Sequence, residues 1–144
     1  MTYFKTLLSM FLLTMSLAAC GPAAYTPETA IAGVKADPTG IVGKFEMTVR
    51  RVDRERGWLY LDSAQDYRDS NTLIVAVSED TAEDILRGRN QTAQQVFLNR
   101  KILVTGLAKR IPIALFDNEG APTGKSYDQT QVFLGDSADL EIVH

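Results

Sequence analysis

Apolar and polar residues alternate between positions 41 and 78, which favours extended strands in this part of the chain. In the segment KFEMTVRRV, Phe45, Met47 and Val49 point to one side of an extended chain and the residues between them to the other. WLYLDS (58–63) alternates in the same way, and TLIVAVS (72–78) is rich in β-branched residues. A turn, DRERG, and a polar loop, AQDYRDSN, separate these runs. The pattern predicts three consecutive antiparallel strands.

The apolar period changes to that of a helix after Ser78. Asp80 and Glu83 have the spacing of a capping box, and the acidic residues crowd the first turn. Three apolar residues then fall on one helical face: Ala82, Ile85 and Leu86. A second short helical piece is predicted over 92–98, where Thr92 begins another capping box.

The period returns to two after these helical pieces. KILVTGLAKRI (101–111) predicts a fourth strand, in which Gly106 indicates a bulge or a tight bend. Residues 112–125, which contain two prolines and two glycines, are expected to form a long loop. A strand and a final short strand are predicted within 127–143.

Three strands, a helix and two more strands is the element order of the OB-fold, a small Greek-key barrel. The segments YLDSAQDYRDSNTLIVAVSED and NRKILVTGLAKRI resemble stand-alone bacterial OB-fold domains of the tRNA-anticodon/helicase broad type, over residues 41–143. The resemblance implies an all-β fold with one helix: a five-stranded OB-fold-like Greek-key barrel with the helix between strands 3 and 4. It implies no activity, and a small β-sandwich is the alternative fold.

Residues 1–19 are predicted to be a signal peptide. Lys5 precedes a short apolar run, 6–18, which as a helix would span roughly 20 Å, less than the roughly 30 Å of a bilayer core. Leu17-Ala18-Ala19-Cys20 resembles the lipobox of bacterial lipoproteins. That resemblance implies transfer of diacylglycerol to the Cys20 sulfur, cleavage before Cys20, and acylation of the new amino group by a fatty acid such as palmitate. An ordinary secretory signal followed by a coincidental cysteine is the alternative.

Two or more acyl chains hold a protein stably on a membrane without a spanning helix. Gly21, and not aspartate, follows Cys20. By resemblance to the enterobacterial sorting rule, this favours the periplasmic face of the outer membrane. Residues 20–40, which contain Pro22, Pro27 and Pro38, are expected to be a flexible tether. The alternative is that part of this segment, 30–35, forms a helical turn packed on the domain.

Composition excludes several classes of protein. The single cysteine excludes an internal disulfide framework. Removing residues 1–19 takes away Lys5 and no acidic residue, which leaves 14 basic and 18 acidic residues and a net charge of −4. That balance disfavours a dedicated nucleic-acid binder. His144 is the only histidine, and no phosphate loop or metal-ligand spacing occurs, so we expect no enzyme, no cofactor and no metal.

In OB-folds, ligands lie across strands 2 and 3, between two flanking loops. Here those loops would be 53–57 and 112–125. The side chains expected on the outward face of the two strands are Trp58, Tyr60, Asp62, Thr72, Ile74 and Ala76. Trp58 and Tyr60 would form a stacking platform for sugars, bases or a partner's side chains. Alternatively, the linker or the long loop covers them, or they pack against cross-strand neighbours.

Four arginines lie close to Trp58 in the sequence: Arg50, Arg51, Arg54 and Arg56. They suggest contacts with phosphates, anionic lipid head groups or cell-wall polymers. Asp53 and Glu55 alternate with them, which favours an internally paired, solvated hairpin. The three aspartates Asp62, Asp66 and Asp69 lack the pattern of a calcium loop and are expected to stabilise turns.

The sequence therefore predicts a non-catalytic, lipid-anchored binding or assembly module of the bacterial envelope. It would dock a protein partner through the face that includes Trp58, Tyr60 and Ile74, with Arg50, Arg54 and Arg56 nearby. The alternative is that the same face binds an oligosaccharide or, less favoured, an oligonucleotide. A protein interface should expose an apolar patch of roughly 600 Å² or more, whereas a glycan site should be a groove with polar groups beside aromatic rings.

Overall fold

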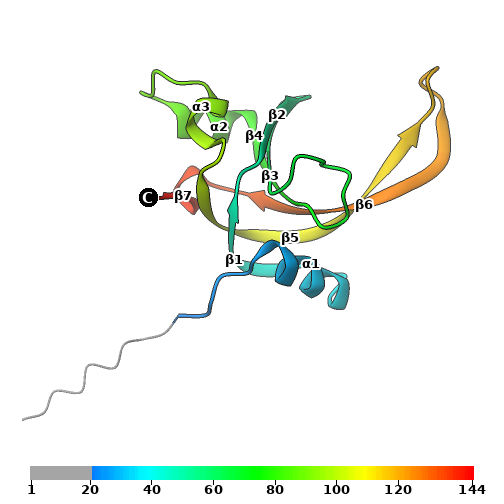
Figure 1. The fold of residues 1–144 in the computed structure, drawn as a ribbon, viewed down its shortest axis with the longest axis horizontal. Coiled ribbons are helices and arrows are strands. Elements are labelled where there is room, and N and C mark those ends of the chain that lie inside the picture. The colour runs from blue at the N-terminus through cyan, green and yellow to red at the C-terminus, as the bar shows by residue number, and fades with distance from the viewer. Residues whose placement is uncertain (1–20) are drawn as a thin grey trace, which may run out of the picture.

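The computed structural model describes residues 21–144, so the predicted signal peptide (1–19) and Cys20 lie outside the described residues. Strands dominate the described part, and a few short helices flank them (Figure 1). The helices are α1 (Pro27–Ala36), α2 (Glu79–Leu86), α3 (Ala93–Phe97) and the 3-10 helix η1 (Ser137–Asp139). The strands are β1 (Ile41–Thr48), β2 (Arg51–Glu55), β3 (Trp58–Asp62), β4 (Leu73–Ser78), β5 (Lys101–Phe116), β6 (Pro122–Leu134) and β7 (Leu140–Val143).

Seven strands of the described chain form one sheet in the order β1-β5-β6-β4-β3-β2, and β7 pairs with β5. All pairs are antiparallel except β4 and β6, which run parallel. The prediction of a mostly β fold with little helix is confirmed, and the predicted strands 58–63 and 72–78 correspond to β3 and β4. Two short helices, α2 and α3, connect β4 to β5.

The first and last strands in the sheet order, β1 and β2, are separated in the chain by only Val49 and Arg50. β1 pairs with β5, whereas β2 pairs with β3. Hydrogen bonding passes from one partner to the other within these two residues: the Val49 N–H donates to the Arg100 carbonyl, and the Arg50 N–H donates to the Asp62 carbonyl. The continuous stretch from β1 to β2 therefore supplies both the first and the last strand of the sheet order.

Alternate residues of the strands pack into one buried cluster. Leu59 and Leu61 of β3 belong to it, and they are fully buried. Ala82 of α2 and Phe97 of α3 join the same cluster. The residues between the buried ones on each strand face the other side of the sheet, because side chains alternate along a strand.

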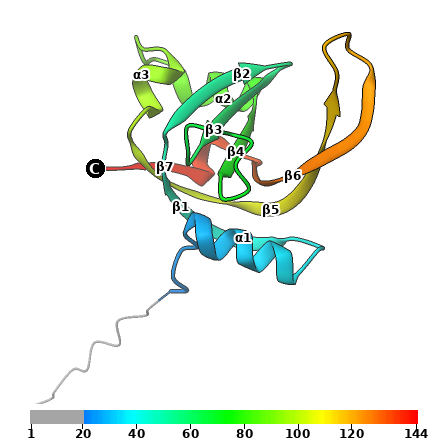
Figure 2. The same cartoon turned by 45° about the vertical axis from the view of Figure 1, so that its right-hand side comes forward.

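The predicted tether is wrong for residues 27–36, which form α1. Figure 2 shows this helix lying along the body of the domain beside β1 and β5. Its Ala30, Ile31 and Val34 are buried. Pro27 lies in the first helical turn, where proline's fixed φ favours a helix and its missing N–H costs nothing, so a proline at this position does not indicate coil. The alternative, a helical segment packed on the domain, is the one observed.

The expected loop at 112–125 is instead a β-hairpin. β5 continues to Phe116 and β6 begins at Pro122, with Pro112 paired opposite Asp128. β1 pairs with β5 only as far as Ala108, so the strand edge beyond that point has no second partner among the described strands. Proline is tolerated there because its missing N–H removes no hydrogen bond on a free edge. The hairpin projects from the body of the domain (Figures 1 and 2), and we call it the hairpin arm (residues 112–127).

The sequence suggested either a bulge or a tight bend at Gly106, and the bulge is not observed. Pairing with β1 continues through Gly106 without a shift, and the irregularity of β5 lies between Ala114 and Phe116. A Cβ on Gly106 would lie 2.5 Å from the carbonyl oxygen of Phe133. A glycine is needed at this position because β6 approaches so closely.

Candidate functional site

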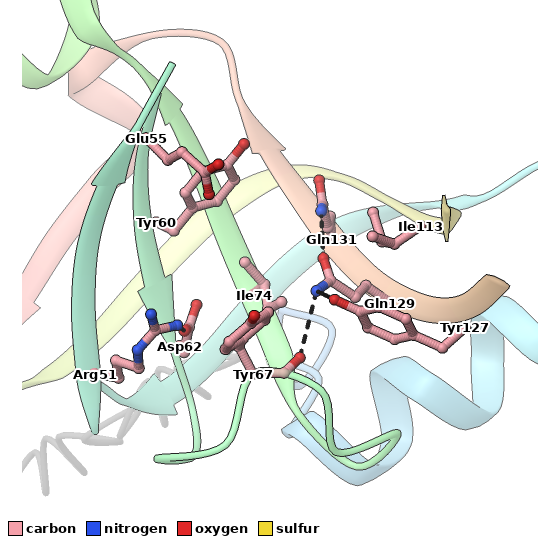
Figure 3. Close-up of a pocket in the computed structure, with 10 residues that line it drawn as sticks. All are labelled: Arg51, Glu55, Tyr60, Asp62, Tyr67, Ile74, Ile113, Tyr127, Gln129 and Gln131. Atoms are coloured by element: carbon pink, nitrogen blue, oxygen red, sulfur yellow. Dashed lines mark hydrogen bonds and ion pairs between the residues drawn. The ribbon is translucent and has the colours of Figure 1, made fainter. Parts of the chain in front are cut away.

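Two adjoining pockets open on the face of the sheet opposite the buried cluster. The first has a volume of about 150 Å³ and the second about 410 Å³. Five residues line both of them: Glu55, Tyr60, Tyr67, Ile113 and Tyr127. We call the smaller one the inner pocket, the larger one the outer pocket, and the two together the groove. Figure 3 shows the inner pocket between β3 on one side and β6 on the other.

Each pocket has its own additional lining. The inner pocket adds Arg51, Asp62, Ile74, Gln129 and Gln131. The outer pocket adds Arg56 from the turn after β2, Arg68 from the loop after β3, and residues 114–116 of the hairpin arm. The groove thus runs from the inner sheet face outward along the hairpin arm.

Strand register brings the inner-pocket residues together from distant parts of the chain. Arg51 is paired with Asp62, Asp62 with Ile74, and Ile74 with Gln131. These four residues therefore form one row across β2, β3, β4 and β6. Side chains in register on one face of a sheet lie within contact distance of each other.

Asp62 is the most unusual residue of the groove. Its side chain is 1% exposed, and its Oδ2 accepts a hydrogen bond of 3.1 Å from Nη1 of Arg51. Its Oδ1 is buried and has no hydrogen-bond partner among the described residues. Burial raises the pKa of Asp62 to about 6, although the Arg51 charge opposes that rise. The site therefore holds a carboxyl group with one buried oxygen that no group of the described chain satisfies.

A row of side-chain hydrogen bonds along β6 forms the opposite wall. Gln131 Nε2 donates to Gln129 Oε1 at 2.8 Å, and Gln129 Nε2 donates to the Tyr127 hydroxyl oxygen at 3.0 Å. Gln129 Nε2 also lies 3.4 Å from the carbonyl oxygen of Tyr67, which ties the loop after β3 to this wall. Figure 3 shows the oxygen of Gln131 directed away from Gln129 at the end of the row. It is a second acceptor oxygen at the inner pocket.

Three tyrosines supply the aromatic surface of the groove. Tyr60 and Tyr127 are partly buried, and burial raises the pKa of both, so their hydroxyls stay neutral. The Tyr67 ring is already covered by cations: the guanidinium carbon of Arg51 lies 4.6 Å from its centroid and that of Arg68 lies 5.4 Å away. Tyr60 and Tyr127 are therefore the rings with a surface left for a ligand.

The expected contact surface of Trp58, Tyr60 and Ile74 is only partly present. Tyr60 lines both pockets. Trp58 lines neither, and packs edge-to-face against Phe133 at a centroid distance of 6.3 Å. Ile74 was expected to be exposed, which is wrong: it is 2% exposed and forms part of the inner-pocket wall. Three other residues expected on the outward face are buried as well: Asp62, Thr72 and Ala76.

The expected arginine cluster is dispersed. Arg50 donates to Asn99 at 3.3 Å, and Arg54 forms an ion pair with Glu79 on α2; neither lines the groove. Arg56 lines the outer pocket, with its Nε 3.5 Å from Glu55. Arg51 pairs with Asp53 and Arg56 with Glu55, as an internally paired segment requires, whereas Arg50 and Arg54 find their partners outside the segment.

Several groove residues were not identified from the sequence: Tyr67, Arg68, Tyr127, Gln129 and Gln131. The sequence of β6 does contain a pattern that indicates the site: polar side chains stand at every second position, Tyr127, Gln129 and Gln131, before an apolar run. Polar residues with period two on a strand that is buried on both faces indicate a lined site.

The described residues contain no group of three or more His, Cys, Asp or Glu side chains arranged to hold a metal ion. Asp66 and Asp69 stabilise the loop after β3, where each accepts a backbone hydrogen bond, from Arg68 and Asn71 respectively, at 2.9 Å. Within the described residues, no helix has the length and apolar character needed to cross a bilayer.

Large exposed apolar side chains are few and scattered over the described surface. They are Val42 on β1, Phe116 at the tip of the hairpin arm, and Val143 on β7. Chemically, the groove combines one buried acceptor oxygen on Asp62, the side-chain amide of Gln131, neutral tyrosine hydroxyls and ring faces, which is a combination suited to a hydroxyl-bearing ligand.

Comparison with known proteins does not assign the chain to a family. No protein-family model matches this chain, and no curated protein matches it.

Proposed function

We propose that this protein is a non-catalytic, lipid-anchored binding module of the bacterial envelope, and that its groove binds an oligosaccharide. The observation on which this rests is the buried carboxyl of Asp62: its Oδ1 has no hydrogen-bond partner in the described chain, and Asp62 lines the inner pocket together with Tyr60 and Tyr127. A buried acceptor without a hydrogen bond is costly, so a ligand that donates one gains affinity there. Sugars offer hydroxyl donors together with apolar ring faces that stack on tyrosine.

The strand connections support an OB-fold as the framework. The continuous stretch of β1 and β2 would be its first strand, followed by β3 and β4, then α2 and α3, and then β5 and β6. Pairing of this stretch with both β5 and β3, and the parallel β4–β6 pair, are consistent with a sheet that curves back on itself. The groove would then lie where OB-folds bind ligands, on strands 2 and 3 between two loops.

Docking of a protein partner is less well supported by the surface. Ile74 is buried and Trp58 is packed against Phe133, so two of the three residues expected to contact a partner are not free. The described surface has scattered apolar side chains in place of a broad patch. An oligonucleotide is disfavoured by the net charge of −4 that the sequence has after residue 19.

The anchor would hold the domain close to the bilayer. Tyr25 already belongs to the fold, since it bridges to Phe45 of β1 and its ring stacks on Phe45 at 5.4 Å. Residues 21–24 alone would separate an acylated Cys20 from Tyr25, which is five Cα steps with a reach of at most about 18 Å when fully extended. The proposed location is the periplasmic face of the outer membrane.

Titration of the purified protein with neutral and acidic oligosaccharides, followed by tyrosine and tryptophan fluorescence, tests the proposal. At least one oligosaccharide should give a saturable change. Asp62→Asn should weaken its binding by about tenfold or more, because a hydrogen bond to a charged acceptor is lost. Asp53→Asn is the matched control, because Asp53 also pairs with Arg51 but lines neither pocket. Absence of saturable binding by every saccharide would remove the proposed function.

A further inference from the structure

Charge is distributed unevenly along the groove. The inner pocket is lined by one basic residue, Arg51, and two acidic ones, Glu55 and Asp62. Arg51 is engaged by two carboxylates, those of Asp53 and Asp62. The outer pocket is lined by two arginines, Arg56 and Arg68, and shares only Glu55 as an acid. The inner pocket therefore disfavours an anion, whereas the outer pocket favours one.

Arg56 is available to a ligand. It lies in the two-residue turn between β2 and β3, with φ of 51°, next to Gly57, which also has a positive φ. Its side chain is 89% exposed, and its one ion pair, with the exposed Glu55, is 3.5 Å long. Ion pairs between exposed side chains contribute little, so Arg56 can exchange Glu55 for another anion at little cost.

Arg68 is held in place but not neutralised. Its Nε donates to the Tyr67 hydroxyl at 3.1 Å, and its guanidinium lies over the Tyr67 ring. No carboxylate of the described chain lies within ion-pair distance of its side chain. Asp66, two residues earlier, accepts from the Arg68 backbone. Arg68 thus presents a fixed guanidinium to the outer pocket, and guanidinium groups bind carboxylates and phosphates in a planar, two-point geometry.

We infer, on the basis of the proposed function, that the saccharide is acidic and that its units differ in charge. A neutral unit donates hydroxyl hydrogens to Asp62 and Gln131 in the inner pocket. A neighbouring unit with a carboxylate or phosphate contacts Arg56 and Arg68 in the outer pocket. A polymer with a charge on every unit would place one against Asp62, which disfavours nucleic acids and homopolymers of uronic acids.

Hyaluronan tetrasaccharide, in which uronate and neutral N-acetylated amino sugar alternate, and tetra-N-acetylchitotetraose (here called chitotetraose), which is neutral throughout, are the test probes. At low salt, the hyaluronan fragment should bind about tenfold more tightly than chitotetraose. This preference should shrink at high salt, because exposed charges are screened. Arg56→Gln combined with Arg68→Gln should abolish the preference, so that the hyaluronan fragment binds the variant no more tightly than chitotetraose does. Arg100→Gln, an exposed arginine outside both pockets, is the control.

The outcomes separate the two proposals. Equal affinity for the two tetrasaccharides, or a preference that survives loss of both arginines, would overturn the acidic-saccharide inference and leave saccharide binding intact. If neither tetrasaccharide binds the wild type but another saccharide of the wider titration does, the acidic-saccharide inference fails and saccharide binding stands; if no saccharide binds, both proposals fail. Tighter binding of tetrathymidylate, of tetragalacturonate or of inorganic phosphate than of the hyaluronan fragment would also overturn the inference, because the groove would then recognise an anion irrespective of the neutral unit.

Discussion

Arg51 and Asp62 pair across β2 and β3, and their ion pair leaves the second carboxylate oxygen of Asp62 buried and unpaired beside the inner pocket. Such an arrangement lowers the stability of the folded domain, because a buried acceptor without a hydrogen bond loses its hydration without compensation. A binding site can keep a group that destabilises the folded protein, because binding requires that group. The cost of Asp62 to stability can be measured through its dependence on pH.

Asp62→Asn should change how stability depends on pH. The folded pKa of Asp62, about 6, lies above its ordinary value of 3.8, so the folded state binds the proton more tightly than the unfolded state. This carboxyl therefore lowers the free energy of unfolding progressively as pH rises from about 4 to 6, by up to about 3 kcal/mol above that range. Urea unfolding at several pH values should show that the free energy of unfolding of Asp62→Asn rises relative to that of the wild type as the pH increases from about 4 to 6. A difference that is constant with pH would contradict the raised pKa.

Val34→Ala should destabilise the domain. The sequence predicts a flexible tether at this position, in which the same change would have no effect on stability. Val34 is 1% exposed on α1 and belongs to the main buried cluster. Loss of two buried methyl groups should lower the free energy of unfolding by about 1.6 kcal/mol. Ala32→Ser, on the exposed side of the same helix, should cost about 0.5 kcal/mol or less. Equal effects of the two changes in chemical denaturation would indicate that α1 does not pack on the domain in solution.

Gly106→Ala should be far more damaging than Gly135→Ala. A Cβ at Gly106 would lie 2.5 Å from a backbone oxygen of β6, which cannot move without displacing the strand, whereas a Cβ at Gly135 meets no atom within 4 Å. Overpacking of this kind costs about 1–3 kcal/mol, and the clash with backbone places Gly106→Ala at the upper end. Thermal unfolding of both variants checks the prediction, and similar melting temperatures would refute the close approach of β5 and β6.

Cys20→Ser should abolish acylation. Cells supplied with radiolabelled palmitate should label the wild-type protein and not the variant, and the wild type should fractionate with membranes because two or more acyl chains give stable anchoring. Equal labelling of the two proteins would remove the proposed anchor. Ser16→Ala, a change within the leader but outside the four-residue lipobox, is the control and should still be labelled.

Local patterns accounted for most of the strands and for α2. The alternation of Leu59 and Leu61 with polar or aromatic neighbours requires only that a strand has one buried face, which is a property of the segment itself. Prolines and glycines were less informative. Pro27 and Pro112 both suggested coil, but one begins α1 and the other lies on a free strand edge, and only the neighbouring elements distinguish these cases.

Sequence alone determined that the chain would be mostly β, that helix would separate two groups of strands, and that one face of each strand would be buried. These features depend on residue periods over fewer than about ten positions. The residues that line the groove, in contrast, could be identified only from the tertiary structure. Arg51, Asp62, Ile74 and Gln131 come from four strands, and strand register, which depends on pairings between distant segments, places them in one row. Burial of Ile74 and the unpaired oxygen of Asp62 follow from that row, because each depends on what lies across the sheet and not on its neighbours in the chain.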